Sequence, residues 1–260
     1  MSPTPLYVGL DIGSVFTKAM VTAEKKPVAS SIVNSGGNFH AASESALKEV
    51  LGKAQTRLED LSGLVVTGVG AESASITARR VSDISCQAMG CFYLFPGART
   101  IIDIGGQYTR AFKITPSGRV ADFLMSEKCA AGSGRFLQII ARILRIGVEE
   151  IGPLSLKAQN PVEFSTSCAV IAESETVSRI AEGASKEDIL AGVHRAMAAK
   201  AAGLVKRLRL EADVVLTGGG AEDIGLIQAV GQALKIKVLV PETPRLTCAY
   251  GAACLATEGK

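Results

Sequence analysis

Short apolar runs separated by turns open the chain, and they predict strands. The runs cover residues 6–12, 16–23 and 27–33, and the tight turns between them favour an antiparallel meander. Apolar residues then recur every three or four positions, which predicts a helix over residues 41–58. A fourth apolar run, 64–67, ends in Gly68-Val69-Gly70 and predicts a buried strand, and a helical stretch over 81–94 stops at a Pro-Gly pair.

The same plan starts again at Thr100. An apolar run over 100–104 ends in Gly105-Gly106, and runs at 110–115 and 119–125 flank the hairpin turn 116–118. A long helical section leads to one more apolar run, 214–217, before Gly218-Gly219-Gly220. Because the first strand of each half ends in Asp-Ile-Gly, we interpret the chain as an α/β protein of two related halves with a cleft between them.

The composition is that of an ordinary globular protein, and it argues against several classes of function. Of 260 residues, 47% are hydrophobic and 20% charged, and the net charge of +3 comes from interspersed groups, which argues against a nucleic-acid surface. The first residues lack a signal-peptide pattern and no apolar run approaches the ~20 residues that span a bilayer, so we expect a cytoplasmic protein without a membrane partner. Six cysteines are too few for a disulfide scaffold in a chain of this length, and the absence of a CxxC pair disfavours a self-contained metal site.

The glycine turns that follow the apolar strands are suited to binding phosphate. A turn without bulky side chains lets backbone N–H groups approach a phosphate group. Asp11 and Asp103 each precede such a turn, and paired carboxylates beside phosphates are what Mg²⁺ or an attacking water requires. Lys18 is near enough to the first turn to neutralise phosphate charge, and the turn at 218–220 would fit adenosine or the α-phosphate. The absence of GxxxxGK[ST], and of GxGxxG after the first strand, disfavours P-loop and Rossmann folds.

Together the three turns resemble the phosphate-1, phosphate-2 and adenosine motifs of the actin, hexokinase and chaperone ATPase superfamily. That resemblance implies a duplicated actin-like (ribonuclease H-like) fold with ATP in the cleft between two lobes. The N-terminal lobe would comprise residues 1–97 with a C-terminal helix over 245–260, and the C-terminal lobe residues 98–244.

Two cysteines occupy unusual positions at the start of predicted helices. Cys129 lies in a Gly-rich turn before an amphipathic helix, and Cys168 directly precedes a second helix. A helix N-terminus favours negative charge and lowers the pKa of a thiol. Two thiolates cannot complete the Cys₄ shell of a [4Fe–4S] cluster, but a two-fold dimer supplies four; ordinary buried cysteines remain the alternative. The remaining cysteines match no ligand pattern and are expected in the core, and both histidines are expected to be structural or exposed: Cys86, Cys91, Cys248, Cys254, His40 and His194.

The cysteine segments MSEKCAAGSGRFLQIIARIL and STSCAVIAESETVSRIAEG resemble signature segments of 2-hydroxyacyl-CoA dehydratase activators and of the ATP-binding subunits of benzoyl-CoA reductases. LDIGSVFTKA and DVVLTGGGAEDIGL support the resemblance, which runs nearly end to end. It implies that Cys129 and Cys168 of each subunit hold one [4Fe–4S] cluster per homodimer. With the phosphate turns, it points to three catalytic residues, namely Asp11, Asp103 and Gln107. The residues implied to contact ATP are Gly13, Ser14, Val15, Phe16, Thr17, Lys18, Gly105, Gly106, Gln107, Gly218, Gly219, Gly220 and Arg245.

An ATPase coupled to electron transfer is the activity that this resemblance implies. A reduced ferredoxin or flavodoxin would supply one electron to the shared cluster, and MgATP would drive its transfer at low potential to a cluster-containing dehydratase or reductase. Two sites depart from the family pattern and bear on the hydrolysis rate and the partner. Tyr108 stands where the family usually has Asp, and Gly68-Val69-Gly70-Ala71 where it often has Gly-Tyr-Gly-Arg. A small-molecule kinase of the same fold and a nucleotide-gated scaffold remain alternatives.

Overall fold

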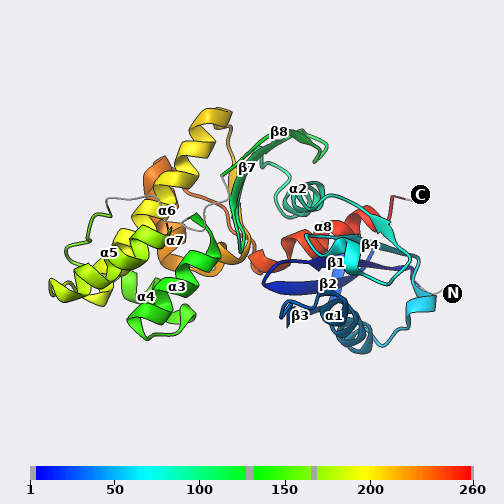
Figure 1. Cartoon of the computed structure of the whole chain (residues 1–260). Coiled ribbons are helices and arrows are strands. Elements are labelled where there is room, and N and C mark those ends of the chain that lie inside the picture. The colour runs from blue at the N-terminus through cyan, green and yellow to red at the C-terminus, as the bar shows by residue number, and fades with distance from the viewer. Residues whose placement is uncertain (1–3, 127–131, 165–168, 259–260) are drawn as a thin grey trace. The chain divides into compact units, whose positions relative to one another are not determined.

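The computed structural model describes residues 4–126, 132–164 and 169–258. Contacts within the chain divide it into two units (Figure 1). The first contains Met1–Gly97, Ile114–Val120 and Arg245–Lys260, and the second Ala98–Lys113 and Ala121–Pro244. The sequence had placed residues 114–120 in the second half, whereas their contacts group them with the first unit.

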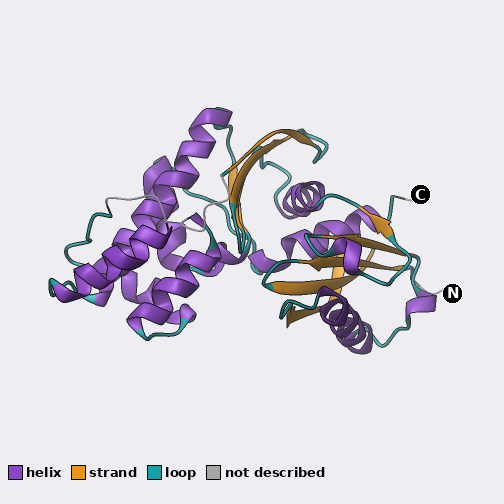
Figure 2. Ribbon diagram, viewed as in Figure 1, coloured by secondary structure: helices purple, strands orange, loops and turns teal. Residues whose placement is uncertain are grey.

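A mixed β-sheet forms the centre of the first unit (Figure 2). It has five strands in the order β3-β2-β1-β4-β5. β1, β2 and β3 pair antiparallel, which confirms the predicted meander, and β4 lies parallel to β1. The parallel pairing brings the carboxyl ends of β1 and β4 to the same edge of the sheet. The strands are β1 (Leu6–Ile12), β2 (Phe16–Ala23), β3 (Lys26–Asn34), β4 (Gly63–Thr67) and β5 (Arg79–Arg80).

The second sheet repeats this arrangement with four strands in the order β8-β7-β6-β9. β6 pairs antiparallel with β7 and parallel with β9, as β1 does with β2 and β4. The strands are β6 (Thr100–Ile104), β7 (Thr109–Ile114), β8 (Val120–Met125) and β9 (Val214–Thr217). The duplication that the two Asp-Ile-Gly segments indicate is therefore present in the strand pairing.

Capping residues decide where several helices begin. The Asn38 side chain accepts a hydrogen bond from Ala41 N, so α1 starts earlier than predicted, and it ends before Gln55, which adopts a φ of 52°. Among the described residues, no helix is long and apolar enough to cross a membrane. The helices are α1 (Phe39–Lys53), α2 (Asp83–Leu94), α3 (Gly134–Leu144), α4 (Ile151–Ser155), α5 (Ala169–Ala181), α6 (Lys186–Leu208), α7 (Ile224–Leu234) and α8 (Thr247–Ala256).

Side chains along β1 point alternately to the two faces of the sheet, and each face packs against a separate hydrophobic core. Val8, Leu10 and Ile12 are fully buried in the core that includes residues of α1. On the other face of the sheet, α8 and α2 contribute to a second core that includes Met20 and Val65. Gly9 lies under α8, since a Cβ there would stand 2.0 Å from the carbonyl oxygen of Ala249.

Glycines allow α8 to pack closely on α2 as well as on β1. A Cβ on Gly251 of α8 would lie 1.8 Å from the Cys86 carbonyl oxygen, and a Cβ on Gly90 of α2 would lie 2.1 Å from the Thr247 carbonyl oxygen. The neighbouring atoms are backbone, which cannot rotate away. The distances from β1 to α8 and from α8 to α2 are therefore fixed by backbone contact.

The four cysteines that the structure describes are buried in the first unit, as predicted. Burial raises the pKa of the Cys86 thiol to about 12 and that of Cys254 to about 11. The pKa of Cys248 is raised well above its ordinary value, first by burial and then by the nearby Asp11 carboxylate. These thiols are therefore protonated at neutral pH.

The two histidines are a buried structural residue and a surface residue, as expected. His194 of α6 is buried, its Nδ1 lying 3.0 Å from the Ser155 hydroxyl and its Nε2 lying 3.0 Å from Asp223 Oδ2. It thereby joins the end of α4 to the N-cap of α7. His40 is half-exposed, 3.5 Å from Glu44 in the next turn of α1.

We predict that Gly251→Ala lowers the free energy of unfolding by about 3 kcal/mol or more, because the added methyl overlaps backbone atoms of α2. Gly203→Ala in α6 is the matched control, since nothing lies within 4 Å of its added Cβ. The control should keep or raise stability by up to ~1 kcal/mol, because alanine favours a helix interior. Urea unfolding measures both, and equal stabilities would contradict the close packing of α8 on α2.

We also predict a loss of stability above pH 9 that depends on Cys86. The folded chain keeps this thiol protonated up to about pH 12, whereas the unfolded chain loses the proton near the ordinary value of 9.0. Stability from this group is complete below pH 9 and falls between these values, by at most about 1.4 kcal/mol per pH unit. In urea unfolding between pH 8 and 10.5, Cys86→Ala should show the shallower decline; identical slopes would refute this explanation.

Candidate functional site

The first glycine turn joins β1 to β2 through residues 13–15. The Gly13 N–H donates to the Phe16 carbonyl oxygen at 3.1 Å, which closes the turn. The Ser35 hydroxyl donates to the Gly13 carbonyl oxygen at 2.7 Å and lies 3.0 Å from the Thr17 hydroxyl. A Cβ on Gly13 would stand 2.7 Å from the Phe16 carbonyl oxygen, so the turn requires glycine.

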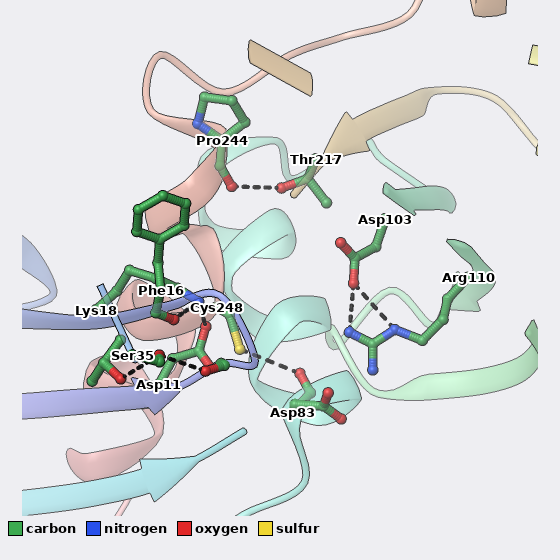
Figure 3. A network of polar contacts seen from close by, with 12 residues as sticks. Asp11, Phe16, Lys18, Ser35, Asp83, Asp103, Arg110, Thr217, Pro244 and Cys248 are labelled. Atoms are coloured by element: carbon green, nitrogen blue, oxygen red, sulfur yellow. Dashed lines mark hydrogen bonds and ion pairs between the residues drawn. The ribbon is translucent and has the colours of Figure 1, made fainter. Parts of the chain in front are cut away.

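Asp11 and Lys18 face each other across the β1–β2 ladder and form a buried ion pair (Figure 3). Lys18 Nζ lies 2.6 Å from Asp11 Oδ2, and the two residues are 9% and 6% exposed. Lys18 Nζ also donates to the Phe16 carbonyl oxygen at 3.2 Å. The lysine thus ties the carboxylate before the turn to the backbone after it, and each buried charge has a counter-ion.

The loop after β4 lies against Oδ1 of Asp11, the carboxylate oxygen that is not paired with Lys18. Gly68 has a φ of 92°, and a Cβ there would lie 2.6 Å from Asp11 Oδ1 and 2.5 Å from the Ile12 carbonyl oxygen. The Gly70 N–H donates to the same carbonyl at 2.9 Å. Only glycine permits both the left-handed backbone and the close approach. Sequence reasoning had not assigned this loop a role at the carboxylate.

In the second unit, Asp103 and Arg110 form the corresponding pair. They are partners in the β6–β7 ladder, and Arg110 Nε and Nη2 lie 3.1 and 2.5 Å from Asp103 Oδ2. Figure 3 shows this pair. The Asp103 and Arg110 side chains are 6% and 10% exposed. The Gly105 N–H donates to the Tyr108 carbonyl oxygen at 3.0 Å, the bond that Gly13 and Phe16 make in the first unit.

The Gly218 turn packs against Asp103 in the way that Gly68 packs against Asp11. Gly218 has a φ of 82°, and a Cβ there would lie 2.4 Å from Asp103 Oδ1. The Thr217 hydroxyl and the Gly218 N–H both donate to the Pro244 carbonyl oxygen, at 3.1 and 3.3 Å. The second and third predicted turns, 105–107 and 218–220, are therefore brought to one carboxylate within the second unit.

The start of α3 is bonded directly to the second turn. The Gly134 N–H donates to the Gly105 carbonyl oxygen at 2.8 Å, and the Arg135 N–H donates to the Gly106 carbonyl oxygen at 3.1 Å. Gln107 is exposed at the tip of the same turn. The first N–H groups of a helix need partners outside it, and here the turn supplies them.

Arg245 and Arg110 are each stacked on an aromatic ring. The Arg245 guanidinium lies 4.3 Å from the centre of the Phe16 ring in the first unit. The Arg110 guanidinium lies 5.2 Å from the centre of the Tyr108 ring in the second. Such contacts favour a cation over the ring face and orient it. The role of Arg245 in binding nucleotide stays a prediction.

The two predicted cluster ligands, Cys129 and Cys168, lie outside the described residues. Within the described part of the chain, no group of three or more His, Cys, Asp or Glu side chains is arranged to hold a metal ion. Sequence reasoning missed Arg110. The signal was present, because Lys18 follows Asp11 and Arg110 follows Asp103 at the same spacing.

Comparison with known proteins shows close relatives along nearly the whole chain. The chain is 39% identical over 251 residues to a 2-hydroxyisocaproyl-CoA dehydratase activator of Clostridioides difficile, covering 96% of this chain and 94% of the relative. It is 34% identical over 250 residues to an (R)-2-hydroxyglutaryl-CoA dehydratase activating ATPase of Acidaminococcus fermentans, covering 96% of each.

Solved structures support the fold. The activator of the 2-hydroxyisocaproyl-CoA dehydratase from Clostridium difficile, with bound ADPNP, matches with a TM-score of 0.93 and 39% identity, covering 97% of this chain and 94% of that one. A ROK family glucokinase from Streptomyces griseus matches with a TM-score of 0.64 at 15% identity, covering 98% of this chain and 100% of that one, and shows the fold alone. The predicted duplicated actin-like ATPase fold is confirmed.

Residues 8–256 match the BadF/BadG/BcrA/BcrD ATPase family. The match spans both glycine turns with their buried carboxylates, and the dehydratase activators described above agree with it. The chain belongs to the BadF/BadG/BcrA/BcrD ATPase family.

Proposed function

We propose that this protein is an ATP-dependent activator that passes a low-potential electron from a [4Fe–4S] cluster, shared between two copies of the chain, to a 2-hydroxyacyl-CoA dehydratase or a benzoyl-CoA reductase-type partner. The relatives' names support the class of partner. Two hydrogen bonds from α3 to the Gly105-Gly106 turn are the observation that most directly supports coupling between the nucleotide and the cluster.

Nucleotide binding is the first part of the proposal. Turns 13–18, 105–107 and 218–220, together with Arg245, bind ATP, and Asp11 and Asp103 act with Mg²⁺ or the attacking water. Gln107, which is exposed at its turn, is the residue proposed to orient that water. The residues fit such a ligand because each turn contains glycines, which leave the backbone accessible, and because both carboxylates are oriented by a cation and by a glycine loop.

Cluster binding is the second part of the proposal. Cys86, Cys248 and Cys254 do not suit it, because they are packed in one core and burial raises the pKa of each thiol, and Cys91 is fully buried. Cys129 and Cys168 are the remaining pair, and two chains supply the four thiolates of a [4Fe–4S] cluster. When bound, the cluster supplies one-electron transfer, and a reduced ferredoxin or flavodoxin is the proposed donor.

The link between nucleotide and cysteine is the third part. α3 follows the Cys129 segment in sequence, and its first two N–H groups donate to the carbonyls of the Gly105-Gly106 turn. Any displacement of that turn by phosphate must therefore move the start of α3 or break these bonds. A nucleotide changes the position of the segment only to the extent that it binds one arrangement more tightly than the other.

Removal of one proposed ligand tests the cluster. Cys129→Ala, purified without oxygen, should lose most of its iron and sulfide, because one of the two thiolates from each chain is gone. Cys91→Ala, which removes a buried thiol of α2, is the control and should keep the full cluster. A full complement of iron and sulfide in Cys129→Ala would refute the ligand assignment; ATP-dependent phosphorylation of a metabolite without iron would favour a kinase.

Removal of one backbone N–H tests the link through α3. Gly134 is the first residue of α3, where proline is tolerated, and Ser133 before it is extended, as proline requires. Gly134→Pro removes the N–H that donates to Gly105, whereas Gly134→Ala keeps it, with its Cβ 3.5 Å from that oxygen. We expect Gly134→Pro to lower ATP-dependent electron delivery to the partner about tenfold and Gly134→Ala to leave it near wild type. Equal delivery by both variants would contradict the link.

A further inference from the structure

The two units repeat their turns contact by contact, at a constant offset in sequence. Asp11, Gly13, Phe16 and Lys18 correspond in sequence to Asp103, Gly105, Tyr108 and Arg110, and the two Asp–basic pairs occupy the same place in the strand register. In each unit the glycine N–H donates to the carbonyl of the aromatic residue, and the basic residue pairs with the carboxylate. Thr67-Gly68 and Thr217-Gly218 end the neighbouring parallel strands in both units. Arg110 therefore occupies the place of Lys18.

The two pairs differ in how firmly the cation holds the carboxylate. Lys18 makes one contact with Asp11 and shares its ammonium group with the Phe16 carbonyl oxygen. Arg110 places Nε and Nη2 on the same carboxylate oxygen of Asp103, and its guanidinium lies over the Tyr108 ring. A planar guanidinium held by two N–H groups and a ring has less freedom than an ammonium group on a flexible chain.

Two neighbours thus restrict the Asp103 carboxylate, one at each oxygen. Arg110 contacts Oδ2, and the Gly218 turn lies against Oδ1 so closely that a Cβ could not be placed there. The residue is 4% exposed, so a misdirected carboxylate would find little water in compensation. Arg110 is the neighbouring cation that fixes the orientation of the carboxylate.

We propose that Arg110 is the positioning residue of Asp103 for ATP hydrolysis and that the Tyr108 ring holds Arg110 in place. This inference rests on the proposed role of Asp103 in the ATPase. It also gives Tyr108, which departs from the family pattern, a function in this chain through its ring and not through its hydroxyl.

The test compares kcat and KM for ATP in four variants. Arg110→Met should lower kcat roughly 10- to 100-fold with KM changed by less than about threefold, because misplacement affects the reacting geometry more than binding. Arg110→Lys restores the charge without the fork and should recover part of kcat. Tyr108→Ala removes the ring and should lower kcat with KM little changed, and wild-type kcat there would overturn the role of the ring. Lys113→Met, which removes the β7 cation that pairs with Glu211, should match wild type.

Binding of a non-hydrolysable ATP analogue separates the possible failures. Wild type that neither binds the analogue nor hydrolyses ATP contradicts the proposed function. Wild-type kcat in both Arg110→Met and Arg110→Lys, in a chain that hydrolyses ATP, overturns the role of Arg110 alone. If Arg110→Met does not fold, Arg110→Lys decides, since it keeps the buried charge paired: full kcat overturns the proposal and reduced kcat at unchanged KM supports it.

Discussion

A buried carboxylate paired with a cation on the next strand is the interaction on which each half of this protein depends. Asp11 with Lys18, and Asp103 with Arg110, lie at the carboxyl end of the first strand of their sheets, directly before a glycine turn. Breaking such a pair on one side leaves an uncompensated buried charge, which typically costs about 3–5 kcal/mol. The same ion pair therefore contributes to the stability of the fold and orients a carboxylate of the candidate site.

Glycines determine what can approach these carboxylates. Gly68 and Gly218 adopt left-handed conformations and bring backbone against Asp11 and Asp103. Behind them, the glycines of β1, α2 and α8 set a close spacing of layers in the first unit. Rigid packing of this kind makes a small displacement at a turn difficult to absorb locally, so it passes to bonded neighbours. At the Gly105-Gly106 turn, those neighbours are the first residues of α3.

The buried cysteines differ from the two proposed cluster ligands in their neighbouring residues. Cys86, Cys248 and Cys254 are packed in an apolar core, and burial raises the pKa of each thiol, which makes them inert. Cys129 and Cys168 stand instead beside glycine, serine and the starts of helices in the sequence. Local environment, and not the number of cysteines, thus separates packing residues from proposed ligands.

The sequence by itself determined the meander, the duplication, the three glycine turns, the two carboxylates and the burial of four cysteines, because apolar periodicity and glycine placement are local properties. Only the tertiary structure showed that Arg110 holds Asp103, that Gly68 packs on Asp11, and that α3 bonds to the Gly105-Gly106 turn. Gly68 and α3 lie far in sequence from the atoms they contact, whereas Arg110 is seven residues from Asp103 and reaches it through the register of β6 and β7. The partners are therefore set by strand register and layer spacing. Neither quantity can be obtained from the residues on one side of the contact.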